Sequence, residues 1–228
     1  MMAAKAIVFD LDGTLYEARH LPFYLIAGDP FHMRTLASER RSRKKLQGMY
    51  FPSAEACYDE LFKVMADSQP TEIEKARKWF WQNYMPLMVK VLGKHFTLRP
   101  HAKELLEALR AKGIRTAVLS DYGMAREKLE AIGCSPDWFD EVLESPAIGG
   151  LKPCKETFLN ACKALGVEPG EALMVGDKVS TDGGALEAGM RFVHILKKEK
   201  LRDKGGVSCN EMLWDEFVSL PLERLLEL

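Results

Sequence analysis

Short apolar runs alternate with amphipathic stretches along most of the chain, and this alternation is interrupted between residues 16 and 97. The first run, residues 6–9, is too short for a core helix and has the unbroken apolar character of a strand buried on both faces. Most amphipathic stretches after residue 98 end at a glycine, as helices often do, and residues 211–228 are expected to form one or two short helices. Further apolar runs lie at residues 115–119, 141–143, 172–175 and 192–195. This order predicts an α/β fold around a parallel sheet.

The interrupting stretch has apolar residues at helical spacing and no strand-like alternation. Ser53 and Thr71 are each predicted to cap the start of a helix, and Pro86 is predicted to kink or end one. Trp79 and Trp81 cannot both face the same side of a helix. We therefore expect an all-helical segment with one of these tryptophans at the surface or in a cleft.

A basic run, Arg40 to Lys45, lies within this helical segment. Charge runs of this kind usually form the solvated face of a helix, and we favour that interpretation. The alternative is that the run faces an anionic substrate or partner.

Composition and charge exclude several classes of protein. With 47% hydrophobic and 29% charged residues, the chain has the composition of an ordinary globular protein, and its net charge of -1 gives no general attraction to nucleic acid. The five cysteines are scattered and form no CxxC pair, which favours reduced thiols over disulfide bonds or a zinc site. The chain leaves no room for a signal peptide before its first strand, and no apolar run approaches the roughly 18 residues of a membrane span. We expect a soluble cytoplasmic protein with no nucleic-acid or membrane partner.

Three of the apolar runs end abruptly in polar residues. The first run leads into Asp10 and Asp12, the run at 115–119 leads into Ser120 and Asp121, and the run at 172–175 leads into Asp177. In a sheet built from βα units these ends meet at one edge, where such sheets bind ligands. Several carboxylates at one edge need a cation, and their hard oxygen atoms suit Mg²⁺. Lys152, in a glycine-rich loop, would add a fixed positive charge.

These residues also resemble the four ordered motifs of the haloacid dehalogenase-like (HAD) hydrolase superfamily. The motifs are Asp10-Leu11-Asp12-Gly13-Thr14, Ser120 after an apolar strand, Lys152 within Gly-Leu-Lys-Pro, and the run Gly176-Asp177-Lys178-Val179-Ser180-Thr181-Asp182. The resemblance extends from residue 6 to about residue 195. It implies a Rossmann-like three-layer core with a parallel sheet, formed by residues 1–15 and 98–228. Residues 16–97 would be an inserted all-helical cap domain of the C1 type that closes over the strand ends.

The resemblance also implies catalytic roles. Asp10 is similar to the nucleophile that forms an aspartyl-phosphate. Asp12 resembles the general acid and base, for which we expect a partly desolvated carboxyl group with a raised pKa. Lys152 resembles the cation that neutralises Asp10 and the phosphoryl group. Tyr16 and His20, where the insert begins, could reach a substrate.

Other residues would bind the phosphoryl group and the metal. Ser120 and the backbone N–H of Asp121 would hold phosphoryl oxygens, together with Lys152. Asp177 would bind Mg²⁺ beside the Asp10 side chain and the Asp12 carbonyl, and Asp182 would orient Lys152 or a metal-bound water. Lys178 stands where many relatives have a small polar residue, and its favoured orientation is toward solvent.

The expected function is Mg²⁺-dependent hydrolysis of a small-molecule phosphomonoester through an aspartyl-phosphate, by a monomer or homodimer. Asp12 argues against the dehalogenase branch, which needs neither an acid for its leaving halide nor a metal. One alternative is a phosphotransferase or phosphomutase, in which a sugar hydroxyl replaces water. Another is a non-catalytic binding or regulatory protein, but this predicts the loss of at least one of Asp10, Asp12, Lys152 and Asp177, and all four are present.

Overall fold

The computed structural model describes residues 3–68, 71–197 and 209–228. Its centre is a six-stranded sheet in the order β3-β2-β1-β4-β5-β6, in which every pair of neighbours is parallel. The strands are β1 (Ala6–Asp10), β2 (Arg115–Ser120), β3 (Glu141–Glu144), β4 (Ala172–Gly176), β5 (Arg191–Leu196) and β6 (Asn210–Leu213). The predicted α/β fold with a parallel sheet is confirmed.

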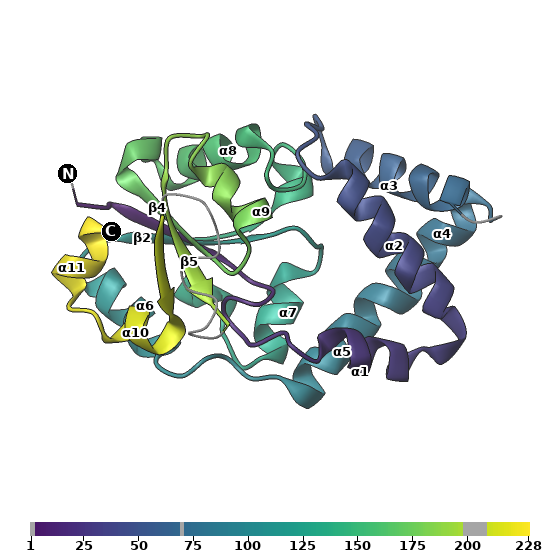
Figure 1. Cartoon of the computed structure of the whole chain (residues 1–228), viewed down its shortest axis with the longest axis horizontal. Coiled ribbons are helices and arrows are strands. Elements are labelled where there is room, and N and C mark those ends of the chain that lie inside the picture. The colour runs from purple at the N-terminus through teal and green to yellow at the C-terminus, as the bar shows by residue number, and fades with distance from the viewer. Residues whose placement is uncertain (1–2, 69–70, 198–208) are drawn as a thin grey trace.

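Helices cover both faces of this sheet, which gives three layers (Figure 1). Side chains of β1 alternate between the two faces, so Ile7 and Phe9 enter one apolar cluster and Ala6 and Val8 enter the other. The first cluster includes residues of α6 (Ala102–Ala111) and α7 (Ala125–Ala131), and the second includes residues of α8 (Lys155–Leu165). Because β1 is fully buried between β2 and β4, its end is a fixed point in the middle of the sheet edge.

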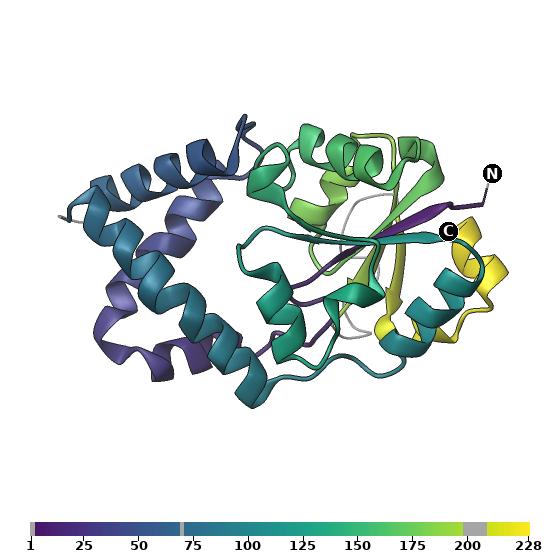
Figure 2. The same ribbon diagram turned by 180° about the vertical axis from the view of Figure 1, so that it is seen from behind.

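The helical segment stands beside the edge at which β1 ends, apart from the sheet in both views (Figures 1 and 2). Its described residues contain helices and no strand, as the sequence predicts. The helices are α1 (Leu21–Gly28), a 3₁₀ turn (Pro30–His32), α2 (Met33–Leu46), α3 (Ala54–Ser68), α4 (Ile73–Trp79), a π-helical turn (Phe80–Tyr84) and α5 (Met85–His95).

Of the two helix caps predicted in this segment, one is confirmed and one is wrong. The Ser53 hydroxyl accepts a hydrogen bond from the N–H of Ala56 at 3.2 Å, which confirms it as a cap of α3. The cap predicted at Thr71 is wrong, because α4 begins at Ile73 and the backbone carbonyl of Glu72 takes the first hydrogen bonds. Pro86 is the second residue of α5 and follows the π-helical turn directly; Tyr84 and Met85 before it keep helical backbone angles, so the helix does not end at Pro86.

The two tryptophans lie on different sides, as expected. Trp79 is 7% exposed and stacks on Tyr84, whereas Trp81 is 38% exposed. The π-helical turn that follows Trp79 shifts the helical register before α5 begins.

The interpretation of the basic run as a solvated face is wrong for one residue. Arg40, Arg41, Lys44 and Lys45 are exposed, but Arg43 is only 5% exposed. Its guanidinium pairs with the buried Glu39 one turn earlier on α2 and contacts the core, because α2 packs this face against the end of β2. A charge run read from sequence does not show which of its members a neighbouring element covers.

The end of the chain also differs from expectation. The final residues form β6 before the two short helices α10 (Trp214–Ser219) and α11 (Leu222–Glu227). This strand was missed because it is short, is only partly buried and lies at the edge of the sheet, so its sequence lacks an apolar run. After β4 the chain forms α9 (Val179–Asp182), followed by a 3₁₀ turn (Gly183–Ala185) in which Gly184 lies directly against Pro153.

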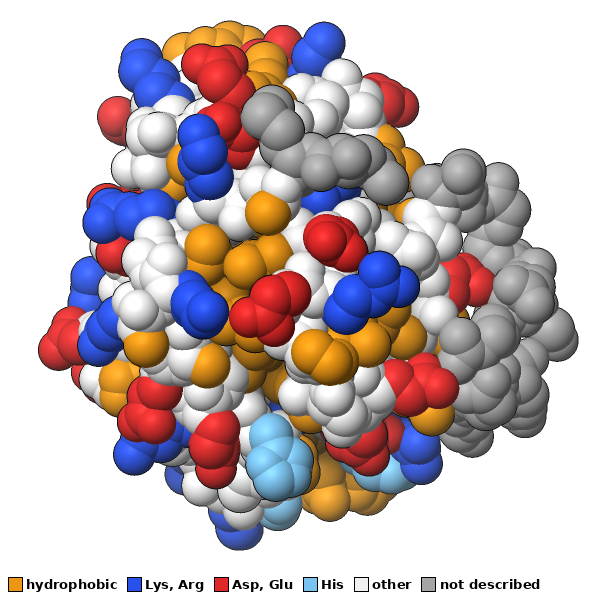
Figure 3. Space-filling view, turned by 90° about the vertical axis from the view of Figure 1, so that its left-hand side faces the viewer, with side chains coloured by type: hydrophobic (Ala, Val, Ile, Leu, Met, Phe, Trp, Pro, Cys, Tyr) orange, Lys and Arg blue, Asp and Glu red, His pale blue; other side chains and the backbone are white. Residues whose placement is uncertain are grey.

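The surface opposite the helical segment has no single dominant charge. Figure 3 shows lysine and arginine side chains interspersed with aspartate and glutamate on that face. None of the described helices has both the length and the apolar character needed to cross a membrane.

Candidate active site

The end of β1 presents Asp10 to a buried lysine. Lys152 Nζ lies 2.7 Å from Asp10 Oδ1 and 2.7 Å from Asp182 Oδ1, and it donates to the Leu119 carbonyl at 3.2 Å. The other oxygen of Asp10 accepts a hydrogen bond from Thr14 at 3.0 Å. Burial lowers the pKa of the 1% exposed Lys152, but Asp10 and Asp182 outweigh it and hold this pKa well above its ordinary value. Lys152 is therefore a fixed cation next to the predicted nucleophile.

The carboxylate of Asp121 holds the loop that carries Lys152. Its Oδ1 accepts from the Ser145 hydroxyl at 2.6 Å and from the backbone N–H of Lys152 at 3.0 Å. The sequence suggested only a role for the Asp121 N–H. The side chain thus connects the end of β2 to the loop after β3, two segments that are distant in sequence.

Asp12 is surrounded by donors. Its Oδ1 accepts from the Tyr16 hydroxyl at 2.5 Å, and its Oδ2 pairs with Lys128 Nζ and lies 3.5 Å from Ser120 Oγ. Burial favours the protonated form of Asp12, but Lys128 and Tyr16 more than offset it and lower the pKa below its ordinary value. Our expectation of a raised pKa is therefore wrong for the protein without substrate, because that expectation did not include Lys128.

Sequence reasoning missed two lysines of this site, Lys128 beside Asp12 and Lys197 beside Asp177. The side chain of Lys128 is 0% exposed, and its Nζ lies 3.4 Å from Ser120 Oγ as well as against Asp12. A signal was present in the sequence: Ala125, Lys128 and Leu129 share one face of α7, and all three are buried. A lysine on the apolar face of an amphipathic helix is almost never buried without a partner.

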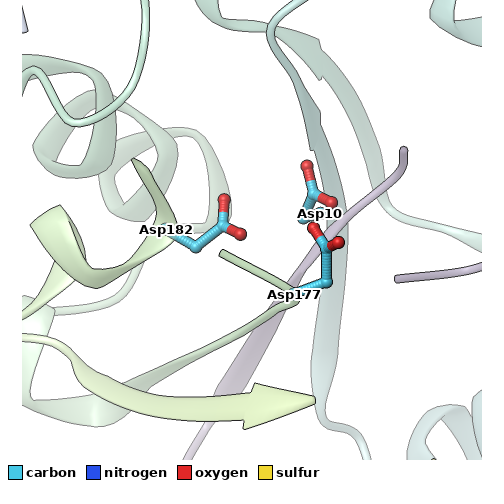
Figure 4. A group of neighbouring side chains, drawn as sticks. All are labelled: Asp10, Asp177 and Asp182. Atoms are coloured by element: carbon cyan, nitrogen blue, oxygen red, sulfur yellow. The ribbon is translucent and has the colours of Figure 1, made fainter. Parts of the chain in front are cut away.

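Three carboxylates form a candidate metal site. Asp10, Asp177 and Asp182 each provide an oxygen atom within 4.8 Å of the others, and Figure 4 shows the three side chains converging from β1, from the end of β4 and from α9. Neither oxygen of buried Asp177 has a hydrogen-bond partner among the described residues, and only Oδ2 forms an ion pair, with Lys197 Nζ at 2.9 Å. Burial and the charge of Asp10 raise the pKa of Asp177. Crowded oxygen donors with one unused acceptor fit Mg²⁺.

Gly13 allows these groups to approach. Its φ is +115°, and a Cβ at this position would lie 2.4 Å from Asp177 Oδ2. A larger residue would therefore push Asp177 away from Asp10.

Asp182 lies between Lys152 and the other candidate metal ligands, Asp10 and Asp177. One of its oxygens pairs with Lys152 and the other accepts from the backbone N–H of Lys178 at 3.1 Å. Burial raises the pKa of Asp182 to about 7, despite the opposing effect of Lys152. The ion pair agrees with the expected orientation of Lys152, and the short distance to Asp10 and Asp177 makes Asp182 a further candidate ligand.

A cavity of about 480 Å³ opens between this edge of the core and the helical segment. Asp12, Asp177, Tyr122 and Lys178 line it from the core. Lys178 is thus exposed, but toward the cavity, and the carboxylates of Asp177 and Asp10 raise its pKa although burial opposes this. The opposite wall is mainly apolar and includes Leu21, Leu25, Ile26, Met33, Leu36, Tyr84 and Met88.

Comparison with known proteins agrees with this geometry. The model of the haloacid dehalogenase-like hydrolase family matches residues 4–189. The chain belongs to this family. N-acylneuraminate-9-phosphatase from Homo sapiens is 39% identical over 207 residues, covering 85% of this chain and 83% of that protein. Phosphoglycolate phosphatase from Rhodospirillum rubrum is 30% identical over 227 residues, covering 95% of this chain and 89% of that protein.

Solved structures of the family share the fold. A HAD phosphatase from Thermococcus onnurineus has a TM-score of 0.59 at 26% identity, over 92% of this chain and 93% of that one. CbbY from Rhodobacter sphaeroides has a TM-score of 0.69 at 20% identity, over 100% of both chains. Together with the phosphatase relatives, these matches identify this HAD protein as a phosphoric monoester hydrolase.

Proposed function

We propose that this HAD phosphatase uses Mg²⁺ and hydrolyses small-molecule phosphomonoesters through an aspartyl-phosphate on Asp10. The observation that carries the proposal is the environment of Asp10. One of its oxygens is held by Lys152 and the other by Thr14, while Asp177 presents an unused carboxylate oxygen nearby. A nucleophilic carboxylate that is held in place and neutralised in this way suits attack on a phosphoryl group.

The first half-reaction transfers the phosphoryl group to Asp10. An Asp10 oxygen bonds to phosphorus while the ester P–O bond breaks, and Asp12 gives its proton to the leaving oxygen. Lys128 and Tyr16 lower the pKa of Asp12 in the protein without substrate, so this step uses a proton that the substrate brings as a phosphate monoanion and that Asp12 passes to the leaving oxygen. Lys128 and Tyr16 hold the carboxylate of Asp12 on the core side of the cavity.

The second half-reaction releases phosphate. Asp12 removes a proton from a water molecule, the water oxygen bonds to phosphorus, and the bond to Asp10 breaks. Ser120 and the Asp121 N–H bind phosphoryl oxygens, and Lys152 offsets their charge. In the structure, Ser120 Oγ also accepts from the N–H of Tyr122 at 3.2 Å, which orients its own hydrogen toward the site.

The Mg²⁺ ligands in this proposal are the side chains of Asp10 and Asp177 and the carbonyl of Asp12. When bound there, Mg²⁺ supplies positive charge that offsets the phosphoryl oxygens. The unpartnered Asp177 Oδ1 and the small space allowed by Gly13 support this assignment.

The helical segment, residues 16–97, acts in this proposal as a cap domain of the C1 type on a core of residues 1–15 and 98–228. The cavity lies where the two meet, so the group attached to the phosphate would occupy it. Excluding water there favours transfer to Asp10 and lets the cap select the leaving group.

The test is phosphate release from a panel of phosphomonoesters, with Mg²⁺ and with EDTA. The panel includes N-acylneuraminate 9-phosphate, phosphoglycolate and glyceraldehyde 3-phosphate, which the names of relatives suggest. We expect EDTA to abolish activity and Mg²⁺ to restore it. Asp10→Asn should lose about a thousandfold or more in kcat, whereas Asp67→Asn, an exposed control on α3, should keep full activity.

Activity that survives EDTA or the Asp10→Asn substitution would contradict the mechanism. Product analysis separates the phosphatase from the phosphotransferase alternative, because only hydrolysis releases inorganic phosphate in proportion to substrate consumed.

A further inference from the structure

Positive and negative side chains are matched on the core side of the site. Lys128 pairs with Asp12, Lys197 with Asp177, and Lys152 with both Asp10 and Asp182. Lys178 lines the cavity together with Asp12 and Asp177. These four carboxylates therefore have four lysines around them, whereas a fifth carboxylate, that of Asp121, is held by the Ser145 hydroxyl and the N–H of Lys152.

The cap side of the cavity is not balanced in this way. Arg19 and Arg40 both line the cavity. Arg19 has a partner, Glu17, at 2.9 Å, and both side chains are about half exposed. The side chain of Arg40 has no ion pair and no hydrogen bond to any of the residues that the structure describes. Within the part of the chain that the structure describes, Arg40 is therefore a positive charge on the cavity wall without an anion.

The position of Arg40 on α2 explains why it faces the cavity. Met33, Leu36, Ala37 and Arg40 follow the spacing of one helix face, and all four line the cavity. Arg41, the next residue, is also exposed but is not part of the lining. Along α2, Arg40 lies one turn before Arg43, which contacts the Asp121 carbonyl, so Arg40 is on the core side of Met33, Leu36 and Ala37. A cavity of about 480 Å³ has room for more than the phosphoryl group.

We propose that the substrate carries a second anionic group, a carboxylate or another phosphate, and that Arg40 binds it across the cavity from Asp10. The inference rests on the proposed function and adds a substrate class to it. A guanidinium presents parallel N–H donors that match two oxygens of either anion. The uncharged part of the substrate would lie against the apolar wall formed by α1, α2 and α5.

The experiment compares matched ligands that differ by one anionic group. One pair is 3-phosphoglycerate and glycerol 1-phosphate, and the other is fructose 1,6-bisphosphate and fructose 6-phosphate. Binding is measured by calorimetry with Mg²⁺ on the Asp10→Asn protein, which holds the ligand without turnover. The kcat/KM of wild-type protein is measured for the same pairs, with p-nitrophenyl phosphate as a substrate that has no second anion.

In at least one pair, we expect the ligand that carries the second anionic group to bind roughly tenfold to a hundredfold more tightly than the ligand that lacks it. Arg40→Ala should remove this preference, mainly through KM. Arg40→Lys should keep only part of the preference, because it keeps the positive charge but loses the parallel N–H donors of the guanidinium. Arg41→Ala, the matched control, should keep all of it. Which pair shows the preference distinguishes a carboxylate from a phosphate.

Equal affinity for both members of both pairs, or no measurable binding of any of them, overturns the inference. So does an equal effect of Arg40→Ala and Arg41→Ala. These outcomes differ from failure of the proposed function, which would appear as the absence of Mg²⁺-dependent phosphate release from every substrate, p-nitrophenyl phosphate included.

Discussion

Asp10 and Asp12 lie two residues apart, yet each carboxylate has its own lysine. Lys152 approaches Asp10 from the loop after β3, and Lys128 approaches Asp12 from α7. Tyr16 adds a hydrogen bond to Asp12 alone, and Thr14 adds one to Asp10 alone. Two like charges at the end of one strand are therefore held apart by different cations, which lets the two carboxylates take different parts in the reaction.

At this scale we predict the effect of Lys128→Met. The substitution leaves the carboxylate of Asp12 buried without its cation, so the free energy of unfolding at pH 7 should fall by about 3 kcal/mol. Lys103→Met, at an exposed position of α6, should have little effect. The measurement is urea unfolding in EDTA, so that no metal contributes.

The same variant gives a prediction for pH. The lowered pKa of Asp12 stabilises the wild-type fold above the ordinary aspartate pKa of about 4, and this contribution is lost as the pH falls through the native value. In Lys128→Met, burial would instead raise this pKa. The stability difference between the two proteins should then be small near pH 4 and grow toward pH 7. A difference that is constant over this range would show that Lys128 acts by packing alone.

At the scale of elements, α2 lines the cavity with one face and packs against the core with another. Arg40 faces the cavity, whereas Arg43 is buried against the end of β2. Arg43 Nε lies 2.7 Å from Glu39 Oε1, its Nη1 donates to the Asp121 carbonyl at 2.7 Å, and its guanidinium lies 4.0 Å from the centre of the Tyr122 ring. The Asp121 carboxylate accepts from the N–H of Lys152. Asp121 therefore connects α2 to the loop that carries Lys152.

This connection predicts two separable effects. Arg43→Met leaves Glu39 buried and unpaired, which should cost about 3 kcal/mol or more in the free energy of unfolding. The double variant Glu39→Met/Arg43→Met should recover most of that stability. Its kcat/KM should still be lowered by about tenfold or more, because the Asp121 carbonyl is no longer held and the site loses its positioning. Arg41→Met serves as the exposed control.

Unfolding curves and phosphatase kinetics on the same samples check this. If the double variant regained both stability and wild-type kcat/KM, Arg43 would serve only to neutralise Glu39.

At the scale of the whole molecule, the cap segment and the core share backbone hydrogen bonds. The N–H of Gly48 donates to the Leu151 carbonyl at 3.1 Å, and the N–H of Phe51 donates to the Gly149 carbonyl at 2.9 Å. The loop between α2 and α3 is thereby joined to the loop that carries Lys152. Gly150, between the two acceptors, has φ +121°, and a Cβ there would lie 2.1 Å from the Met49 carbonyl oxygen.

Gly150→Ala should therefore separate these loops. We expect a loss of roughly 1–3 kcal/mol from backbone strain and a lowered kcat, because Lys152 lies two residues further along. The control is Gly170→Ala, where a Cβ would meet no atom within 4 Å. Thermal unfolding and steady-state kinetics measure both effects, and unchanged values for Gly150→Ala would mean that the loops move apart without consequence.

The sequence by itself determined the parallel α/β core and the family. Apolar runs that end in acids are local features, and the rule for parallel crossovers places such ends at one edge. Asp10, Asp177 and Asp182, which the sequence assigned to the metal site or its surroundings, do lie within 4.8 Å of one another. Their metal-binding and catalytic roles stay predictions.

Only the tertiary structure decided how these groups are paired. The Lys128 and Asp12 side chains meet across 116 residues of sequence, and Arg43 meets the Asp121 carbonyl across 78. Whether a charged side chain on a helix is solvated or buried depends on the element packed against that face, which local sequence does not specify. For the same reason the pKa of Asp12 is lowered rather than raised: burial is a property of the strand end, but the cation that outweighs it comes from a different helix.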